Sequence, residues 1–398
     1  MKFSNLERKQ LANEVFSNLQ KYVRDVNLSE AQEKLYNPGL ILRDEALTFA
    51  TPNIGKMETT CRFTFLASEN NVTTLPDSDQ SVVYLGDFGS HFKVLDVYAW
   101  EGKAQILLLL LPRDYRWKYF REEEFVEERS LIEEARASFE KEPFSGETNG
   151  IDQETWAHCI DAFGELVGVD LDNQYFETEV SVESMKFRVD YYSFRQTYHK
   201  FVYVEFEDLL ADFMPEIDTE GATGLIVYGY IDESKGMCYQ PVALATEHEY
   251  GFTTKPLDGE YMYVFSSNTF DERDYCALNY FEIDDSGFDA FEKRIKSSYD
   301  TKNPSLADIR NLEAIDLFRH TEYPDDCQVA IVKEGLLPEL VWVRLDNHYE
   351  GTYFGELLNP PCQDYGLCLG DRIRARIEDI GPENPIGDLE GIMLVSRI

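Results

Sequence analysis

The chain has few basic residues for its length, and this shortage argues against several functions. Its 398 residues include 37 Lys and Arg but 75 Asp and Glu, which gives a formal net charge of -38. Proteins bind nucleic acids and anionic lipid surfaces through cations, so neither is expected as a partner. A negative field instead attracts basic proteins and speeds their encounter. Solubility alone is the alternative interpretation of the same charge.

Long hydrophobic segments and cysteine pairs are also missing. The longest aliphatic run, Ile106 to Leu111, is far shorter than the roughly 20 residues of a membrane-spanning helix. The first ten residues lack the apolar core of a signal peptide. The seven cysteines form no CxxC pair, which is typical of reduced thiols. We therefore expect a soluble, cytoplasmic protein with free cysteines.

The familiar catalytic and cofactor motifs are absent as well. The sequence has no GxxxxGK[ST] or GxGxxG loop for phosphates, and no HExxH or GxSxG. Its six histidines are too scattered for the spacing of a zinc site. Close acid pairs such as Asp284 and Asp285 are expected by chance among 75 acids. We predict no cofactor and no metal, and we leave enzymatic activity open while favouring a non-enzymatic role.

Aromatic residues are abundant, and they point to sheets. Aromatics make up 14% of the chain and hydrophobic residues 43%, enough for packed cores. Residues 5–23 have a helical period. Short β-branched or aromatic stretches at 60–66, 81–85, 91–100 and 104–111 then predict an antiparallel meander. Residues 115–141 predict a long helix whose glutamates at 122–124 and 127–128 form a solvated face.

The order of elements then repeats. A helix at 152–163 is followed by strands at 175–192, 200–206, 224–231, 261–265 and 276–283, and by helices at 287–298 and 305–318. Strands cluster instead of alternating with helices, which predicts an α+β fold of mostly antiparallel sheets with flanking helices. We divide the chain into α+β domains at 1–145 and 146–320 and a small β-rich domain at 321–398.

The last of these domains shows strand and turn signals of its own. Strands are predicted at 338–345, 352–358 and 372–377, in the pattern of a small curled sheet or partial barrel. Trp342, the run 353–361 (Tyr-Phe-Gly-Glu-Leu-Leu-Asn-Pro-Pro), Gly370-Asp371 and 377–380 carry a recognisable pattern. Over about residues 338–381 the chain resembles the YegJ-like family, a bacterial domain of uncharacterised function. The resemblance implies a fold and no reaction.

Two groups of residues are candidates for contact with a partner. Arg372, Arg374 and Arg376 alternate with apolar residues, so one face of their strand is basic. They either pair with acids on the neighbouring strand, such as Glu350 or Glu356, or contact an anion or partner. A second group is aromatic, and it packs within a sheet or anchors an interface. Its members are Tyr191, Tyr192 and Tyr198.

Three functions are compatible with these features. The first is an acidic cytoplasmic interaction protein, of the toxin-immunity type, that binds a basic protein. The second is a hydrolase with an unrecognised carboxylate site, for which a deep pocket of converging acids or histidines would argue. The third is a structural or regulatory accessory module. The -38 charge favours the first.

Overall fold

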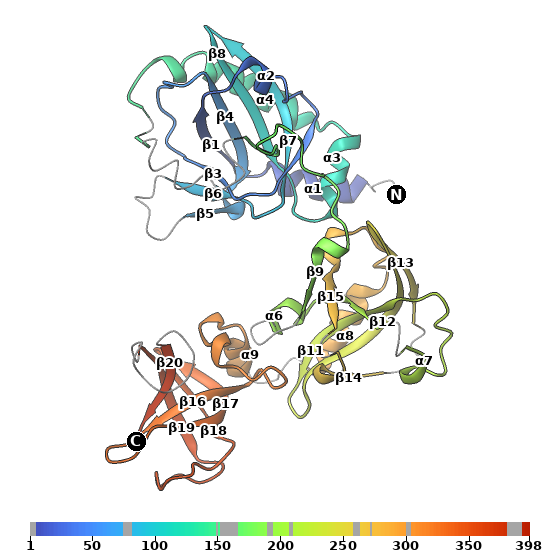
Figure 1. Cartoon of the computed structure of the whole chain (residues 1–398), viewed down its shortest axis with the longest axis vertical. Coiled ribbons are helices and arrows are strands. Elements are labelled where there is room, and N and C mark those ends of the chain that lie inside the picture. The colour runs from blue at the N-terminus through green and yellow to red at the C-terminus, as the bar shows by residue number, and fades with distance from the viewer. Residues whose placement is uncertain are drawn as a thin grey trace. The chain divides into compact units, whose positions relative to one another are not determined.

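A computed structural model describes residues 5–74, 82–148, 150–151, 166–188, 194–206, 210–257, 263–270, 273–299, 304–379 and 392–398. The chain divides into two compact units, residues 1–180 and 181–398. Antiparallel sheets with flanking helices make up most of both units, and a small barrel ends the chain (Figure 1). The predicted α+β class is confirmed. The division into three domains stays a prediction.

The first unit is built on a five-stranded sheet with the order β1-β4-β8-β7-β2. Strands β7 and β8 form a hairpin through Glu101 and Gly102, whose φ angles of 47° and 77° suit a tight turn. The predicted meander is wrong in two respects. Strand β4 pairs with β8 in parallel, and the strand predicted at 81–85, β6 (Val83–Leu85), pairs with β3 and β5 in a separate three-stranded sheet. The strands are β1 (Leu19–Val26), β2 (Ile41–Asp44), β4 (Cys61–Ser68), β7 (Ser90–Trp100) and β8 (Lys103–Leu110).

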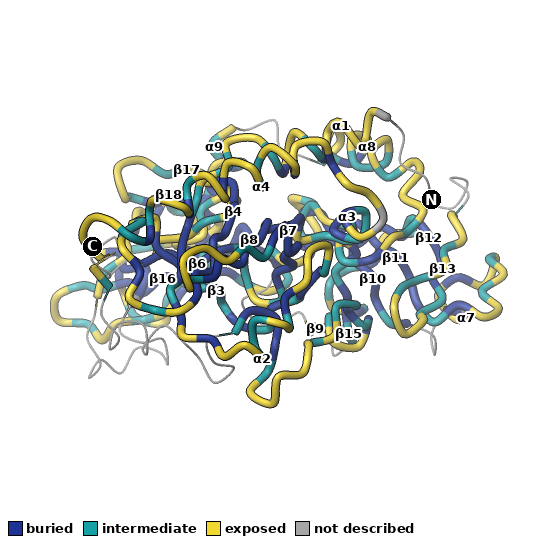
Figure 2. Tube along the Cα trace, turned by 90° about the horizontal axis from the view of Figure 1, so that it is seen from above, coloured by how far each residue is buried: buried dark blue, intermediate teal, exposed yellow. Residues whose placement is uncertain are grey.

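Both faces of this sheet are covered. One face holds a core that includes Phe63, Phe65 and Phe92, and the other lies under helices with Trp117 and Phe120. In Figure 2 the strands β4, β7 and β8 are dark blue, whereas α1 and α4 present exposed outer faces. The remaining elements of this unit are α1 (Asn5–Phe16), α2 (Glu30–Glu33), β3 (Thr48–Ala50), η1 (Glu69–Asn71), β5 (Val72–Thr74), β6 (Val83–Leu85), η2 (Tyr115–Lys118), α3 (Tyr119–Glu122), α4 (Val126–Phe139) and η3 (Glu142–Phe144).

Two predicted helices are shorter than expected. The helix predicted over 5–23 ends at Phe16, because Asn18 adopts the left-handed conformation (φ 54°) and the chain continues as β1. The helix predicted over 115–141 is broken: Phe125 has extended dihedral angles (φ -87°, ψ 143°) and separates α3 from α4. Its buried ring is the reason we infer for the break, since a continuous helix would place it differently. The helix predicted at 152–163 lies outside the described residues.

The second unit contains a larger sheet with the order β13-β12-β11-β10-β15-β9, and β14 pairs with β12. The 13-residue β12 contains Pro241, which sits at a register shift opposite Val227, where a strand tolerates proline. The elements are η4 (Glu183–Met185), β9 (Lys186–Arg188), α6 (Phe194–Thr197), β10 (Phe201–Glu205), α7 (Leu210–Phe213), β11 (Gly224–Asp232), β12 (Gly236–His248), β13 (Gly251–Pro256), β14 (Phe265–Ser266), η6 (Ser267–Phe270), β15 (Asp274–Ala277), η7 (Leu278–Tyr280) and α8 (Phe288–Tyr299).

A closed five-stranded barrel follows within the same unit. Its strands pair in sequence order, and β16 and β20 close it in parallel. Val329, Val343, Leu357 and Ile373 belong to its buried core. The elements are α9 (Pro304–Arg310), η8 (Glu313–Phe318), β16 (Asp326–Val332), β17 (Glu339–Tyr349), β18 (Thr352–Leu357), β19 (Arg372–Asp379) and β20 (Ile392–Arg397). Three of the five strands were predicted.

Candidate functional site

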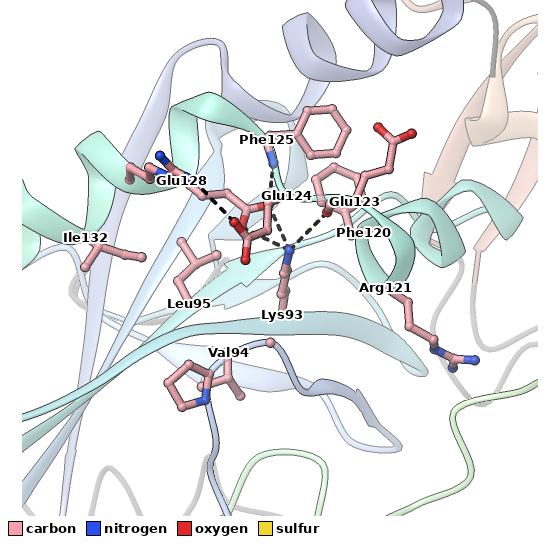
Figure 3. Close-up of a pocket in the computed structure, with 13 residues that line it drawn as sticks. Lys93, Val94, Leu95, Phe120, Arg121, Glu123, Glu124, Phe125, Glu128 and Ile132 are labelled. Atoms are coloured by element: carbon pink, nitrogen blue, oxygen red, sulfur yellow. Dashed lines mark hydrogen bonds and ion pairs between the residues drawn. The ribbon is translucent and has the colours of Figure 1, made fainter. Parts of the chain in front are cut away.

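A half-open cleft lies in the first unit, between strand β7 and the helices α3 and α4 (Figure 3). Its volume is about 360 Å³, which is within the range of small-molecule sites. The chain reaches it from three places: the loop before β2, the middle of β7, and the junction of α3 with α4. Its lining consists of Pro38, Gly39, Lys93, Val94, Leu95, Phe120, Arg121, Glu123, Glu124, Phe125, Glu128, Arg129 and Ile132.

A buried ion pair forms the floor of the cleft. The Lys93 ammonium lies 2.9 Å from each carboxylate oxygen of Glu128 and 3.4 Å from the backbone oxygen of Glu123. The side chains of Lys93 and Glu128 are only 5% and 8% exposed. Figure 3 shows Lys93 reaching toward the start of α4, with the Arg121 guanidinium pointing away from it. All three ammonium N–H groups are therefore occupied.

Glu128 departs from the predicted solvated face. Glu123, Glu124 and Glu127 are exposed, as expected, but Glu128 is 6% exposed. Its carboxylate also accepts a long hydrogen bond (3.4 Å) from the backbone N–H of Phe125, the residue before the first turn of α4. The extended backbone at Phe125 turns α4 so that Glu128 faces β7, and Lys93 compensates the buried charge.

A buried histidine lies close to the cleft, on the same face of the sheet. The His91 ring stacks on Trp117 with centroids 4.2 Å apart, and its Nε2 donates to the backbone oxygen of Thr178 at 2.9 Å. Burial lowers the pKa of His91 to about 4. Arg121 lies 5.0 Å from the Trp117 ring centroid and pairs with Glu179. Trp117 thus covers His91, which keeps the ring neutral near pH 7.

The cleft is better equipped for binding than for acid–base chemistry. Lys93 has no free N–H, and His91 is covered by Trp117. In the described ranges no group of three or more His, Cys, Asp or Glu could hold a metal ion. The six described cysteines are free thiols, of which Cys362 and Cys368 are exposed.

One stretch of the second unit is rich in acidic residues and lacks basic ones. Between Lys200 and Lys235 the sequence contains nine Asp and Glu and no Lys or Arg. The exposed acids of this stretch follow one another along α7 and the loop after it, around an aromatic side chain, Phe213. We call this group the acidic α7 surface. It consists of Asp212, Phe213, Glu216, Asp218 and Glu220.

Phe213 is 44% exposed although two rings of the core hold it in place. Its ring centroid lies 5.5 Å from that of Phe206 and 6.0 Å from that of Phe265. Among the acids around it, Asp218 pairs with Lys255 at 3.5 Å, and no described cation pairs with Glu216 or Glu220. The acidic α7 surface therefore combines a fixed, half-exposed aromatic side chain with exposed acids that lie within eight residues of it in the sequence.

The predicted basic stripe lies on the outside of the barrel. Arg372, Arg374 and Arg376 are exposed and alternate with buried residues, as the pattern predicted. Arg372 pairs with Asp346 of β17, and the Nε of Arg376 donates to the Thr352 hydroxyl at 2.9 Å. Arg374 has no ion-pair or hydrogen-bond partner among the described residues. Cross-strand pairing accounts for part of the stripe, and a partner contact of Arg374 stays a prediction.

The predicted aromatic group is only partly described. Tyr191 and Tyr192 lie outside the described residues. Tyr198 is half-buried, and its ring stacks on His199 with centroids 3.9 Å apart and tilts against Phe194 at 5.7 Å. These contacts are packing within the second unit.

Comparisons with known proteins identify neither a family nor a function for this chain. No protein-family model and no curated protein matches the chain. The type III effector XopAI from Xanthomonas axonopodis pv. citri is 14% identical, with a TM-score of 0.19, and the match covers 25% of this chain and 44% of that one. The chain thus spans less than half of that protein. The C3larvin toxin, an ADP-ribosyltransferase from Paenibacillus larvae, is 12% identical with a TM-score of 0.20. That match covers 28% of this chain and 74% of the toxin. Matches at this level say nothing about the activity of this chain.

In the part of the chain that the structure describes, no helix has the length and apolar character needed to cross a membrane.

Proposed function

We propose that this protein binds a basic protein partner in the cytoplasm, in the manner of a toxin-immunity protein, and that the acidic α7 surface contacts that partner. The observation that carries the proposal is Phe213, a half-exposed ring fixed by Phe206 and Phe265 among exposed acids. Within the same proposal, the C-terminal barrel is a YegJ-like domain, which supplies a scaffold and no reaction.

Charge and shape contribute to binding in different ways. The net charge of -38 steers a basic partner and raises its association rate, an effect that salt screens. A rigid aromatic ring slows dissociation, because burying it costs little conformational entropy and removes apolar surface from water. A surface with both features fits a folded basic protein better than a small cation.

Affinity capture from the native host tests the proposal. The immobilised full chain should retain a basic protein in stoichiometric amount at about 50 mM salt, and much less of it at about 500 mM. Recovery of no basic protein at either salt concentration would contradict the proposal. Retention that is unchanged by salt would contradict the role of charge.

A further inference from the structure

The cleft over Lys93 and Glu128 has polar groups that its own contacts leave available. Lys93 uses its three N–H groups on Glu128 and on the Glu123 backbone. Glu128 has capacity left: Oε1 accepts from Lys93 and from the Phe125 N–H, whereas among the described residues Oε2 accepts only from Lys93. A carboxylate oxygen has two lone pairs. The floor can therefore accept a further hydrogen bond, and Lys93 cannot donate one.

The buried ion pair of Lys93 and Glu128 is not expected to stabilise the fold. Taking two charges out of water costs about as much as their attraction returns, so apolar residues would serve the core equally well. Lys93 stands among the apolar residues of β7, and Leu95 beside it belongs to the same helix-covered core. A carboxylate held at the bottom of an open cleft fits a binding role.

The walls and rim define the remaining chemistry of a ligand. Phe120, Phe125, Leu95 and Ile132 supply apolar walls. Above them, the Glu123 and Glu124 side chains are 43% and 79% exposed, and they pair with Arg8 at 3.1 Å and with Arg129 at 3.8 Å. The net charge of -38 concentrates cations near the protein and repels anions.

The two arginines of the cleft do not change this conclusion. Arg121 is held by Glu179 and lies over the Trp117 ring. Arg129 is 81% exposed and pairs with Glu124 at 3.8 Å, so its charge is compensated at the rim. Neither guanidinium reaches the floor as a free donor for an anion.

We propose that this cleft binds an ammonium or guanidinium group carried on an aliphatic chain, with the charged group on Glu128 and the chain along the apolar walls. Such a group occurs on free alkylamines and on lysine or arginine side chains. The inference goes beyond the proposed function, because it needs neither the acidic α7 surface nor a protein partner.

Titration of the full chain with n-butylammonium and with n-butanol, followed by saturation-transfer NMR, tests the charge requirement. The two probes have nearly the same shape, so the contact with Glu128 should make butylammonium bind about tenfold more tightly. A blocked tripeptide with a central lysine distinguishes the sources. Tighter binding of the tripeptide assigns the cleft to a protein side chain, and tighter binding of butylammonium assigns it to a free amine. Equal binding of butanol and butylammonium, or no binding of either cation, would overturn the proposal.

A pair of variants on α4 locates the binding. Ile132 lines the cleft and Leu131 does not, although both are half-buried and pack against the same core. Ile132→Phe should lower the butylammonium affinity by about tenfold, because the added ring occupies the cleft. Leu131→Phe should change it by less than about twofold. Equal effects of the two substitutions would contradict this location. The comparison of the two probes on the unsubstituted chain decides the proposal even if a variant misfolds.

Discussion

The side-chain oxygen of Asn359 accepts a hydrogen bond from the backbone N–H of Trp342, with 2.7 Å between the heavy atoms. The next link is made by the backbone, because the Leu358 N–H donates to the Trp342 oxygen at 2.8 Å. Asn359 thus prolongs the pairing of β17 with β18 just after β18 ends at Leu357. The Asn-Pro-Pro stretch is therefore explained by strand termination.

Replacing Asn359 tests this structural role. Asn359→Ala leaves the Trp342 N–H without its partner and should destabilise the barrel by about 1–2 kcal/mol. Hydrogen exchange of the β17 amides measures the change. Asn347→Ala is the matched control, because Asn347 is exposed on the same strand and its side chain makes no described hydrogen bond. Equal protection in the two variants would contradict the role given to Asn359.

The buried pair below the cleft predicts a non-additive result. Glu128→Gln leaves the Lys93 charge without compensation and should cost about 3 kcal/mol or more. The double variant Lys93→Met with Glu128→Leu should recover most of that loss, since an apolar pair suits the core around Leu95. Urea unfolding of the first unit measures both, because guanidinium salts would screen the ion pair. A double variant no more stable than Glu128→Gln would contradict the pairing of Lys93 with Glu128.

His91 predicts a loss of stability in acid. Its pKa is lowered by burial to about 4, against about 6.5 in an unfolded chain. The unfolded state then binds more protons between these two values, so stability falls as the pH drops from about 6.5 to 4, by up to about 3 kcal/mol. His91→Gln should lose this part of the pH dependence, while retaining a donor for the Thr178 oxygen.

Unfolding curves of the native chain and of His91→Gln at several pH values measure this difference. His248→Gln is the control, because His248 is exposed and bonds only to the Thr253 hydroxyl among the described residues. Parallel stability profiles of the native chain and His91→Gln would contradict the assignment.

Gly236 lies so close to the backbone of Glu322 that a larger residue would clash there. A Cβ at this position would lie 2.0 Å from the Glu322 backbone oxygen, which also accepts a hydrogen bond from the Met237 N–H at 2.7 Å. Gly221 has the same φ angle of 78° and open space around it. Both substitutions strain the backbone, but only Gly236→Ala also creates a clash with Glu322. Gly236→Ala should therefore lower the free energy of unfolding by about 2 kcal/mol more than Gly221→Ala. Thermal unfolding compares the two variants, and equal costs would show that the contact with Glu322 is unimportant.

Local sequence pattern predicted the strands that carry their own signals. The alternation of Arg372, Arg374 and Arg376 with apolar residues placed β19 correctly, and Glu101-Gly102 correctly marked the β7–β8 turn. What local pattern could not supply was pairing between distant segments. Almost every residue of β4 and of β8 is buried, so neither strand shows the alternation of apolar and polar residues that would indicate its neighbour. The parallel pairing of β4 with β8 therefore could not be predicted.

The cleft was missed for a related reason. Glu128 lies in a run of glutamates that reads as a solvated face, and only tertiary contact with β7 distinguishes it from its neighbours. Lys93 was the available signal, because a charged residue inside the apolar strand 91–97 requires a buried partner. For the acidic α7 surface the available signal was the absence of Lys and Arg between Lys200 and Lys235, but residues 142–185 lack Lys and Arg as well, so this signal did not single it out.

The central claim is that the acidic α7 surface contacts a basic partner, and a matched pair of triple variants tests it most directly. Asp212→Asn, Glu216→Gln and Glu220→Gln remove three charges next to Phe213. The control removes three charges from exposed acids elsewhere in the unit that make no described side-chain contact, through Glu233→Gln, Glu249→Gln and Asp285→Asn.

Both triple variants change the net charge equally, so long-range steering falls equally in both. The dissociation constant for the captured basic protein, measured at about 50 mM salt, should rise at least about tenfold for the variant beside Phe213 and less than about threefold for the control. Equal effects of the two variants would contradict the claim, because they would show that the partner responds to total charge and not to this surface.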